Sequence, residues 1–352
     1  MASRSIPIYS TKNLLDYIAV FSEEFPILFE LFAKHASFII DMEDHELDAA
    51  LADSDSDLSK FQCGYDIDIR ADKVFFSTVK HNPGILTKKS RTLCFLDMDE
   101  ASAVAIGQEY GVIVHSSSVE KDFNPFAASY KKSLIKGIPI KGVNGWQILA
   151  SEMELSPRNT IIISDRYLFT NDFATSGYEN LVSCLKSLMP GSFKGSFHVL
   201  ITSFYPNIDQ KKLNILFGFL CTELRSSFNY DIKIELFVAP QNSELVIHKR
   251  RVFLGYQTIN CDKGFNLFAD RDDHNKPRDD NEFIVTPAFI PNNLGDSQFY
   301  IDSLDLERIT KLCKEIGKRY SGKLSSHNSD TVLVAGDFNK QEFVPNNRLL
   351  NK

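Results

Sequence analysis

Three largely apolar segments separated by helical patterns constrain the fold of this chain most. They are "TIII" (160–163), "HVLI" (198–201) and "IKIELFV" (232–238), and the segments between them, 177–190 and 209–228, have the periodicity of helices. Apolar runs of this kind are typical of strands that are buried on both faces of a sheet. Strands that alternate with helices predict an α/β fold, with a mixed, largely parallel sheet and helices on both of its faces.

The length of 352 residues favours more than one hydrophobic core. Residues 10–40 have apolar side chains at helical spacing, with a break or kink expected at Pro26, and an α/β pattern begins near residue 61. The segment after about residue 335 shows no core pattern. We therefore expect an N-terminal helical segment, a small α/β domain, a main α/β domain and a loosely ordered tail, over residues 1–60, 61–155, 156–335 and 336–352.

Charge and composition limit the functional classes. The formal net charge is −7, whereas nonspecific nucleic-acid binders are usually basic, so a polyanion site must be a local patch. The apolar runs are far shorter than a membrane span, and the first ten residues lack the apolar core of a signal peptide. The six cysteines form no CxxC pair. These features predict a cytoplasmic protein with reduced thiols and no membrane span.

Polar clusters follow the predicted strands at the positions where α/β proteins bind ligands. Residues 164–167 (Ser-Asp-Arg-Tyr) come after the first apolar run, and Thr202 and Ser203 come after the second. In open α/β sheets, ligands bind beyond the carboxyl ends of parallel strands. A third cluster lies in the strand-like segment 244–268, which contains consecutive basic residues within an apolar pattern.

Strand alternation divides the basic residues of this third cluster between two faces. His248 and Arg250 are expected on one face, with Lys249 and Arg251 on the other. The first pair could offer an imidazole and a bidentate guanidinium to a phosphate. A structural interpretation is that His248 and the arginines pair with Asp165 or Glu244 and that the outward charges protect a sheet edge. The sequence leaves both interpretations open.

The chain resembles a diverged phospholipase-D-like module over residues 155–320. In one branch of that superfamily, an Asp-Arg-Tyr strand end precedes a His-Asp-Arg strand and a Gly-Phe-Asp-Leu-Phe-like turn. The positions of this chain that match the three elements are Asp165, Arg166 and Tyr167, then His248 and Arg250, then Gly264, Phe265, Leu267 and Phe268. Lys249 stands where the second element has its acid.

The resemblance implies recognition of phosphodiesters without turnover. Catalytic members carry HxKxxxxD, usually twice, in which one histidine attacks phosphorus and a second acts as acid and base. His248 has no lysine two residues later, and the near match "HNKPRDDN" (274–281) lies in a hydrophilic segment that we interpret as a loop. The implied ligand is nucleic acid or another phosphodiester. The residues expected to bind it are Asp165, Arg166, Tyr167, His248, Arg250 and Lys263. The resemblance also implies a protein partner, within a larger bacterial defence-type system.

Two other functions stay open from the sequence. Asp97, Asp99 and Glu100 follow an apolar strand pattern and could hold Mg²⁺, and His115 could join them. A metal-dependent nuclease or phosphatase would use Asp97 and Asp99, with Asp165 as a further candidate. Acids in this position also cap the next helix, and we expect at least one of the two to cap the helix that begins near Glu100. The residues otherwise predict no cofactor. The third function is a scaffold that binds a partner protein through the Phe-rich faces and N-terminal helices.

Overall fold

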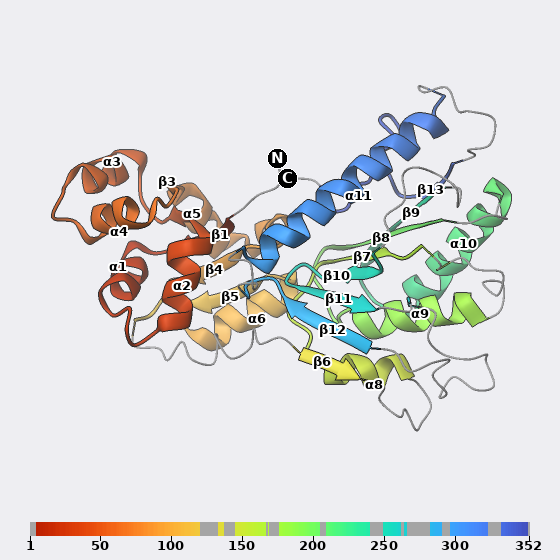
Figure 1. The fold of residues 1–352 in the computed structure, drawn as a ribbon, viewed down its shortest axis with the longest axis horizontal. Helices are drawn as coiled ribbons and strands as arrows, with labels where there is room; N and C mark the ends of the chain where they lie inside the picture. The colour runs from red at the N-terminus through yellow and green to blue at the C-terminus, as the bar shows by residue number, and fades with distance from the viewer. Residues whose placement is uncertain are drawn as a thin grey trace. The chain divides into compact units, whose positions relative to one another are not determined.

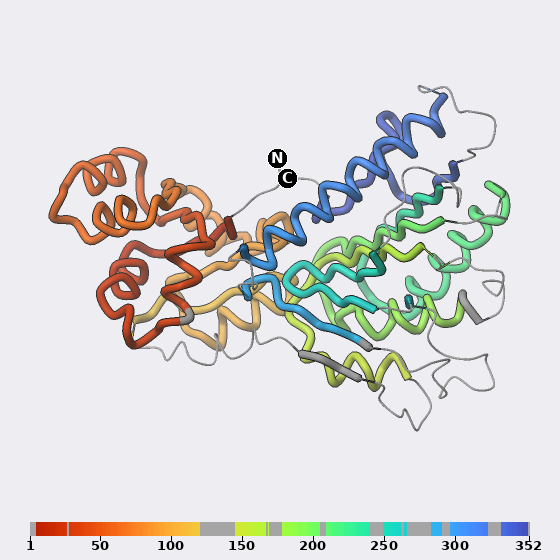
Figure 2. The backbone as a smooth tube through the Cα atoms, viewed as in Figure 1, coloured from red at the N-terminus to blue at the C-terminus, as the bar shows by residue number. Residues whose placement is uncertain are grey.

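The computed structural model describes residues 5–119, 133–136, 145–166, 168, 176–204, 209–239, 249–261, 264–265, 282–290, 296–322 and 332–350 (Figure 1; Figure 2). The chain separates into two compact units. Unit 1 comprises residues 1–131 and 287–303, and unit 2 comprises residues 132–286 and 304–352.

Unit 1 contains a five-stranded sheet in the order β3-β2-β1-β4-β5, with every pairing parallel. Its strands are β1 (Ile6–Ser10), β2 (Ala36–Ile40), β3 (Ile69–Ala71), β4 (Leu93–Leu96) and β5 (Ile113–Ser116). Its helices are α1 (Lys12–Val20), α2 (Pro26–His35), α3 (Asp44–Ala52), α4 (Asp57–Tyr65), α5 (Lys73–His81) and α6 (Glu100–Tyr110), with a short 3-10 helix η1 (Pro83–Lys88). The alternation of strands and helices produces parallel pairing, because each helix returns the chain to the end of the sheet at which the strands begin.

The structure differs from the sequence prediction at two places in unit 1. The segment 10–40, predicted to have helical periodicity up to its end, finishes in β2, whereas the predicted break at Pro26 is confirmed, because α1 ends at Val20 and Pro26 begins α2. The segment from Lys73 to Val79, whose aromatic and β-branched residues favour a strand, belongs to α5. Asp72 accepts a hydrogen bond from the Phe75 N–H at 2.9 Å, and this N-cap outweighs the strand preference of the aromatic and β-branched residues that follow.

Unit 2 contains an eight-stranded mixed sheet in the order β13-β9-β8-β7-β10-β11-β12-β6. The strands are β6 (Ser133–Lys136), β7 (Thr160–Ser164), β8 (Ser196–Phe204), β9 (Asp231–Ala239), β10 (Arg251–Phe253), β11 (Gln257–Cys261), β12 (Glu282–Pro287) and β13 (Leu333–Gly336). The prediction that the three apolar segments are neighbouring strands is confirmed, because β7, β8 and β9 pair in parallel. β10 and β13 flank them in antiparallel orientation. The predicted α/β fold is therefore confirmed.

Helices cover both faces of this sheet. They are α8 (Gly145–Glu152), α9 (Ser176–Leu188), α10 (Gln210–Ser227) and α11 (Gln298–Tyr320), of which α11 has its residues from Leu304 onwards in unit 2. Apolar residues of α8, α9 and α10 pack with Ile161, Ile163 and Ile201 on one face. On the other face, α11 packs with Ile162, Leu200 and other apolar residues (Figure 1). We call this second side of the sheet the α11 face.

The basic segment that was predicted as one long strand or a bent pair forms a hairpin in its described part. β10 and β11 pair in antiparallel orientation, and Arg251 lies opposite Asn260. Gly255 in the turn has φ +87°, a conformation that favours glycine. The N–H of Leu254 donates to the carbonyl of Gln257 at 2.9 Å and closes the turn.

The prediction of a loosely ordered tail after about residue 335 was wrong for the residues described up to 350. Leu349 and Leu350 are buried in the core on the α11 face, and Asn347 is fully buried. The sequence does not show this because the segment is held largely by polar contacts, which leave no apolar periodicity to detect.

Candidate functional site

The carboxyl ends of β7, β8 and β9 form one edge of the sheet in unit 2. Ser164 at the end of β7 lies in register with Thr202 of β8, and Thr202 lies in register with Phe237 of β9. On the other side of β7, Arg251 of β10 is opposite Ser164. Because β10 is antiparallel to β7, the residues just before Arg251 also lie at this edge. This is the region of an α/β sheet in which ligands bind.

Asp165, the first residue after β7, is held by contacts on both its main chain and its side chain. It is 2% exposed. Its N–H donates to the Thr202 carbonyl at 3.2 Å, and its own carbonyl accepts a hydrogen bond from Ser203 Oγ at 2.7 Å. Its Oδ2 accepts a hydrogen bond from the N–H of Phe265 at 2.8 Å. The carboxylate therefore connects the end of β7 to the turn that follows β11.

Gly264 brings Asp165 and Arg250 close together. A β-carbon on Gly264 would lie 2.7 Å from Asp165 Oδ2 and 3.4 Å from Arg250 Cδ. Gly264 also has φ +91°, so a larger residue would be strained at this position. The missing side chain lets a buried carboxylate and the stem of an arginine pack against the same point of the turn. The half-buried Arg166 directly follows Asp165 at this edge.

Three of the six predicted ligand-binding residues are thus placed at one edge, namely Asp165, Arg166 and Arg250. Tyr167, His248 and Lys263 lie outside the described residues, as does the near match at 274–281. Whether these residues bind a ligand stays a prediction.

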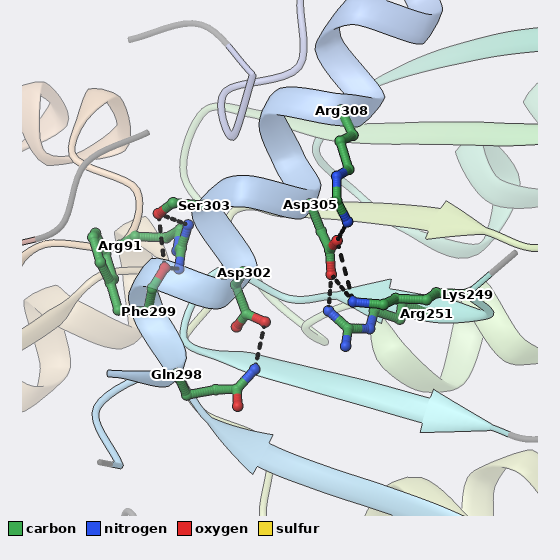
Figure 3. A network of polar contacts seen from close by, with 9 residues as sticks. All are labelled: Arg91, Lys249, Arg251, Gln298, Phe299, Asp302, Ser303, Asp305 and Arg308. Carbon is green, nitrogen blue, oxygen red and sulfur yellow. Dashed lines mark hydrogen bonds and ion pairs between the residues drawn. The ribbon is translucent and has the colours of Figure 1, made fainter. Parts of the chain in front are cut away.

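A second polar cluster lies on the α11 face of β10, around Asp305 of α11 (Figure 3). The Asp305 side chain is 5% exposed and forms an ion pair with Arg251 Nη1. Lys249 Nζ lies 3.2 Å from its Oδ2, and Arg308 Nη1 lies 3.0 Å from its Oδ1. One buried carboxylate therefore contacts three cationic side chains. We call this group the Asp305 cluster.

The two clusters agree with the predicted alternation of the basic residues. Lys249 and Arg251 both reach Asp305, whereas Arg250 packs against Gly264 beside Asp165. The acid that pairs with Lys249 and Arg251 was not identified from the sequence, which pointed to Asp165 or Glu244. Asp305 is 54 residues from Arg251 in the chain. The only sequence signal was the helical i,i+3 spacing of Asp305 and Arg308, and this spacing does not show which strand the helix covers.

Thr202 and Ser203, predicted from the sequence as a polar cluster after the second strand, have different environments. Ser203 donates a hydrogen bond to the Asp165 carbonyl. Thr202 is 1% exposed, and its hydroxyl has no hydrogen-bond partner among the described residues. A buried hydroxyl without a partner costs about 1–3 kcal/mol.

The acids that follow β4 in unit 1 have local structural partners. Asp99 Oδ1 accepts a hydrogen bond from the Ser102 N–H at 2.9 Å, which confirms the predicted cap of α6. The hydrogen bonds from Ser102 lower the pKa of Asp99. Asp97 is largely exposed and lies 3.6 Å from Lys80 Nζ. His115 Nδ1 lies 2.7 Å from Glu100 Oε1. Among the residues that the structure describes, no three His, Cys, Asp or Glu side chains are grouped so that they could hold a metal ion.

Comparisons with known proteins give no family for this chain. No protein-family model matches it, and no curated protein matches it in sequence. Among solved structures, it is similar to polyphosphate kinase from Porphyromonas gingivalis, with 16% identity and a TM-score of 0.24. The match covers 45% of this chain and 21% of that protein, so this chain spans about a fifth of its length. At this TM-score the similarity assigns neither fold nor activity.

In the part of the chain that the structure describes, no helix combines the length and the apolar character that a membrane span requires.

Proposed function

We propose that the carboxyl edge of β7 to β9 recognises phosphodiester groups of nucleic acid or a similar ligand and does not cleave them. The observation that carries this proposal is the packing of Arg250 and the buried Asp165 against Gly264 at the ligand-binding edge of the sheet. A guanidinium group can donate two parallel hydrogen bonds to a phosphate. Asp165 would balance part of the positive charge of this edge when no phosphate is bound.

The absence of turnover is supported by the residues around Arg250. Lys249, the lysine that directly follows His248, directs its ammonium to Asp305 on the α11 face, opposite the side on which Arg250 packs. A lysine on that face could not assist a reaction beside Asp165. The motif HxKxxxxD is also incomplete in the sequence of this segment. A phospholipase-D-like protein of this kind would act in the cytoplasm, as one subunit of a larger defence-type assembly.

The proposal is tested by replacing Arg250 with alanine. We expect Arg250→Ala to weaken binding of a fluorescent oligonucleotide by about 1–3 kcal/mol, because charge-assisted hydrogen bonds to phosphate have this magnitude. The slope of log affinity against log salt should fall by about 0.7 for a single strand, because one fewer phosphate is neutralised.

The control is Arg70→Ala, since Arg70 is an exposed arginine of unit 1 that pairs with Asp68. We expect this control to bind like the unchanged protein. Unchanged affinity of Arg250→Ala with reduced stability would support the structural interpretation instead. Cleavage of the oligonucleotide in the presence of Mg²⁺ would contradict the absence of turnover.

A further inference from the structure

The Asp305 cluster carries more positive charge than its carboxylate can balance. Among the described residues of the cluster, Lys249, Arg251 and Arg308 carry three positive charges and Asp305 carries one negative charge, an excess of two. Asp302, one turn earlier on α11, accepts a hydrogen bond from Gln298 Nε2 at 2.8 Å. With Asp302 included, the described cations of this region outnumber the described carboxylates by one, in a protein whose net charge is −7.

The three cations differ in their exposure. Arg251 has a side chain that is only 13% exposed, and its pairing with Asp305 is sufficient to neutralise that carboxylate. Lys249 and Arg308 are 49% and 63% exposed, and both are held near the same carboxylate. Like charges held this close together repel one another, and a bound anion would remove the repulsion.

The exposed cations also keep hydrogen-bond donors that can reach a ligand. Arg308 contacts Asp305 through Nη1. A guanidinium has five N–H donors and an ammonium has three, so both groups can contact Asp305 and a phosphate together. The buried carboxylate fixes the two flexible side chains in place, which lowers the entropy cost of binding.

From these observations we infer that the Asp305 cluster is a second phosphate site, and that the ligand is a single strand of nucleic acid bound through its backbone. The inference rests on the proposed function, because Arg250 would bind one phosphate and Lys249 with Arg308 a further phosphate of the same strand. Arg250 and Lys249 are neighbours in the chain but point to opposite faces of the sheet. A flexible single strand can bend around the edge to reach both faces, whereas a duplex is stiff over this distance.

The inference is tested with labelled oligothymidylates of two lengths, a dinucleotide and a strand of about 12 nucleotides, which is typical of single-strand sites. The test variant is Lys249→Met with Arg308→Gln, which keeps the buried Arg251–Asp305 pair and replaces each exposed cation with a flexible neutral side chain. The control is Lys186→Met with Arg70→Gln, in which the same two substitutions affect ion pairs with Glu223 and Asp68. Thermal unfolding of all proteins checks that the fold is kept.

We expect the test variant to lose about tenfold in affinity for the long strand and to bind the dinucleotide like the unchanged protein. Equal affinity of test and control variants for the long strand would overturn the second site. Equal losses of affinity for the dinucleotide and the long strand would also overturn the second site. The substitutions would then affect binding only through the Arg250 site.

The two hypotheses fail in different ways. Absence of dinucleotide binding, or dinucleotide binding that Arg250→Ala leaves intact, would contradict the proposed function of the first site. Duplex DNA that binds as tightly as a single strand of equal length would overturn the single-strand assignment. Inorganic polyphosphate that binds more tightly than the oligonucleotide would overturn the assignment to nucleic acid.

Discussion

The amino ends of β7 and β8 are covered by the C-terminal segment of the chain (residues 344–350), whereas at their carboxyl ends the described cationic side chains outnumber the described carboxylates. At the amino ends, Thr160 Oγ1 donates to Asn347 Oδ1 at 3.0 Å, and Asn347 Nδ2 donates to the Ile161 carbonyl at 3.3 Å. His198 Nδ1 donates to the Asn346 carbonyl at 3.0 Å. The protein itself therefore satisfies many of the polar groups at this end.

Glu235 of β9, on the α11 face, also has a hydrogen-bond partner in the C-terminal segment. Its Oε1 accepts a hydrogen bond from the Asn346 N–H, and the side chain is 1% exposed. Burial raises the pKa of Glu235 to about 7, and burial lowers the pKa of His198 to about 4. Both groups are thus held towards their neutral forms under the C-terminal segment. Polar side chains whose hydrogen bonds are made by the C-terminal segment contribute to stability. Cations that outnumber the carboxylates beside them favour the binding of an anion.

Replacing Asp305 with asparagine tests the carboxyl end and has the largest expected effect. Asp305→Asn leaves Arg251 half-buried without its carboxylate, which should cost about 3–4 kcal/mol in the free energy of unfolding measured with urea. Arg308→Gln should cost no more than about 0.5 kcal/mol, because Arg308 is exposed. Unchanged stability would show that this carboxylate does not anchor the cluster.

The part of the sheet that the C-terminal segment covers is tested through the pH dependence of Glu235, in the middle of β9. Its pKa is about 7 in the folded protein against an ordinary value of 4.5, which corresponds to about 3 kcal/mol. The folded state keeps a proton that the unfolded state loses, so this contribution to stability is complete below pH 4.5 and is lost as the pH rises through 7. His198 has the opposite sign, since its contribution is complete above pH 6.5 and is lost as the pH falls towards 4.

The measurement is therefore the free energy of unfolding in urea at several pH values, compared between Glu235→Gln and the unchanged protein. As the pH rises from 4.5 to 7, we expect the free energy of unfolding of Glu235→Gln to increase by about 3 kcal/mol relative to that of the unchanged protein. A difference that stays constant over this range would mean that Glu235 is ionised in the folded protein. His198→Gln is the companion variant, and it should remove the opposing slope below pH 6.5.

The smallest effect is expected where the chain leading into the C-terminal segment crosses α11. A β-carbon on Gly317 would lie 1.9 Å from the Phe343 carbonyl oxygen, so Gly317→Ala should cost about 2 kcal/mol in the free energy of unfolding. The matched control is Gly218→Ala in α10, where a β-carbon meets nothing within 4 Å. Because alanine favours helix, this control should gain about 0.5–1 kcal/mol. Equal stability of the two variants would show that residue 343 does not pack closely on α11.

The α/β class, the three central strands and several helix starts could be predicted from the sequence. These features depend on local periodicity and capping, which adjacent residues specify. The alternation of Arg250 with Lys249 and Arg251 could likewise be predicted, because side chains of a strand point in turn to its two faces. The N-cap of α6 by Asp99 is a local feature of the same kind.

The residues that complete each cluster could not be predicted in this way, because they come from distant parts of the chain. Asp305 meets Arg251 because α11 packs across β10, and Asn346 and Asn347 meet Glu235 and Thr160 because the chain returns from its C-terminal end. The contact between Asp165 and the turn at Gly264 likewise joins positions about 100 residues apart. Side chains so far apart in the chain leave no periodic signal, since their pairing depends on how complete helices and strands pack. The excess of positive charge at one end of the strands, and the sealed polar groups at the other, therefore became visible only in the folded chain.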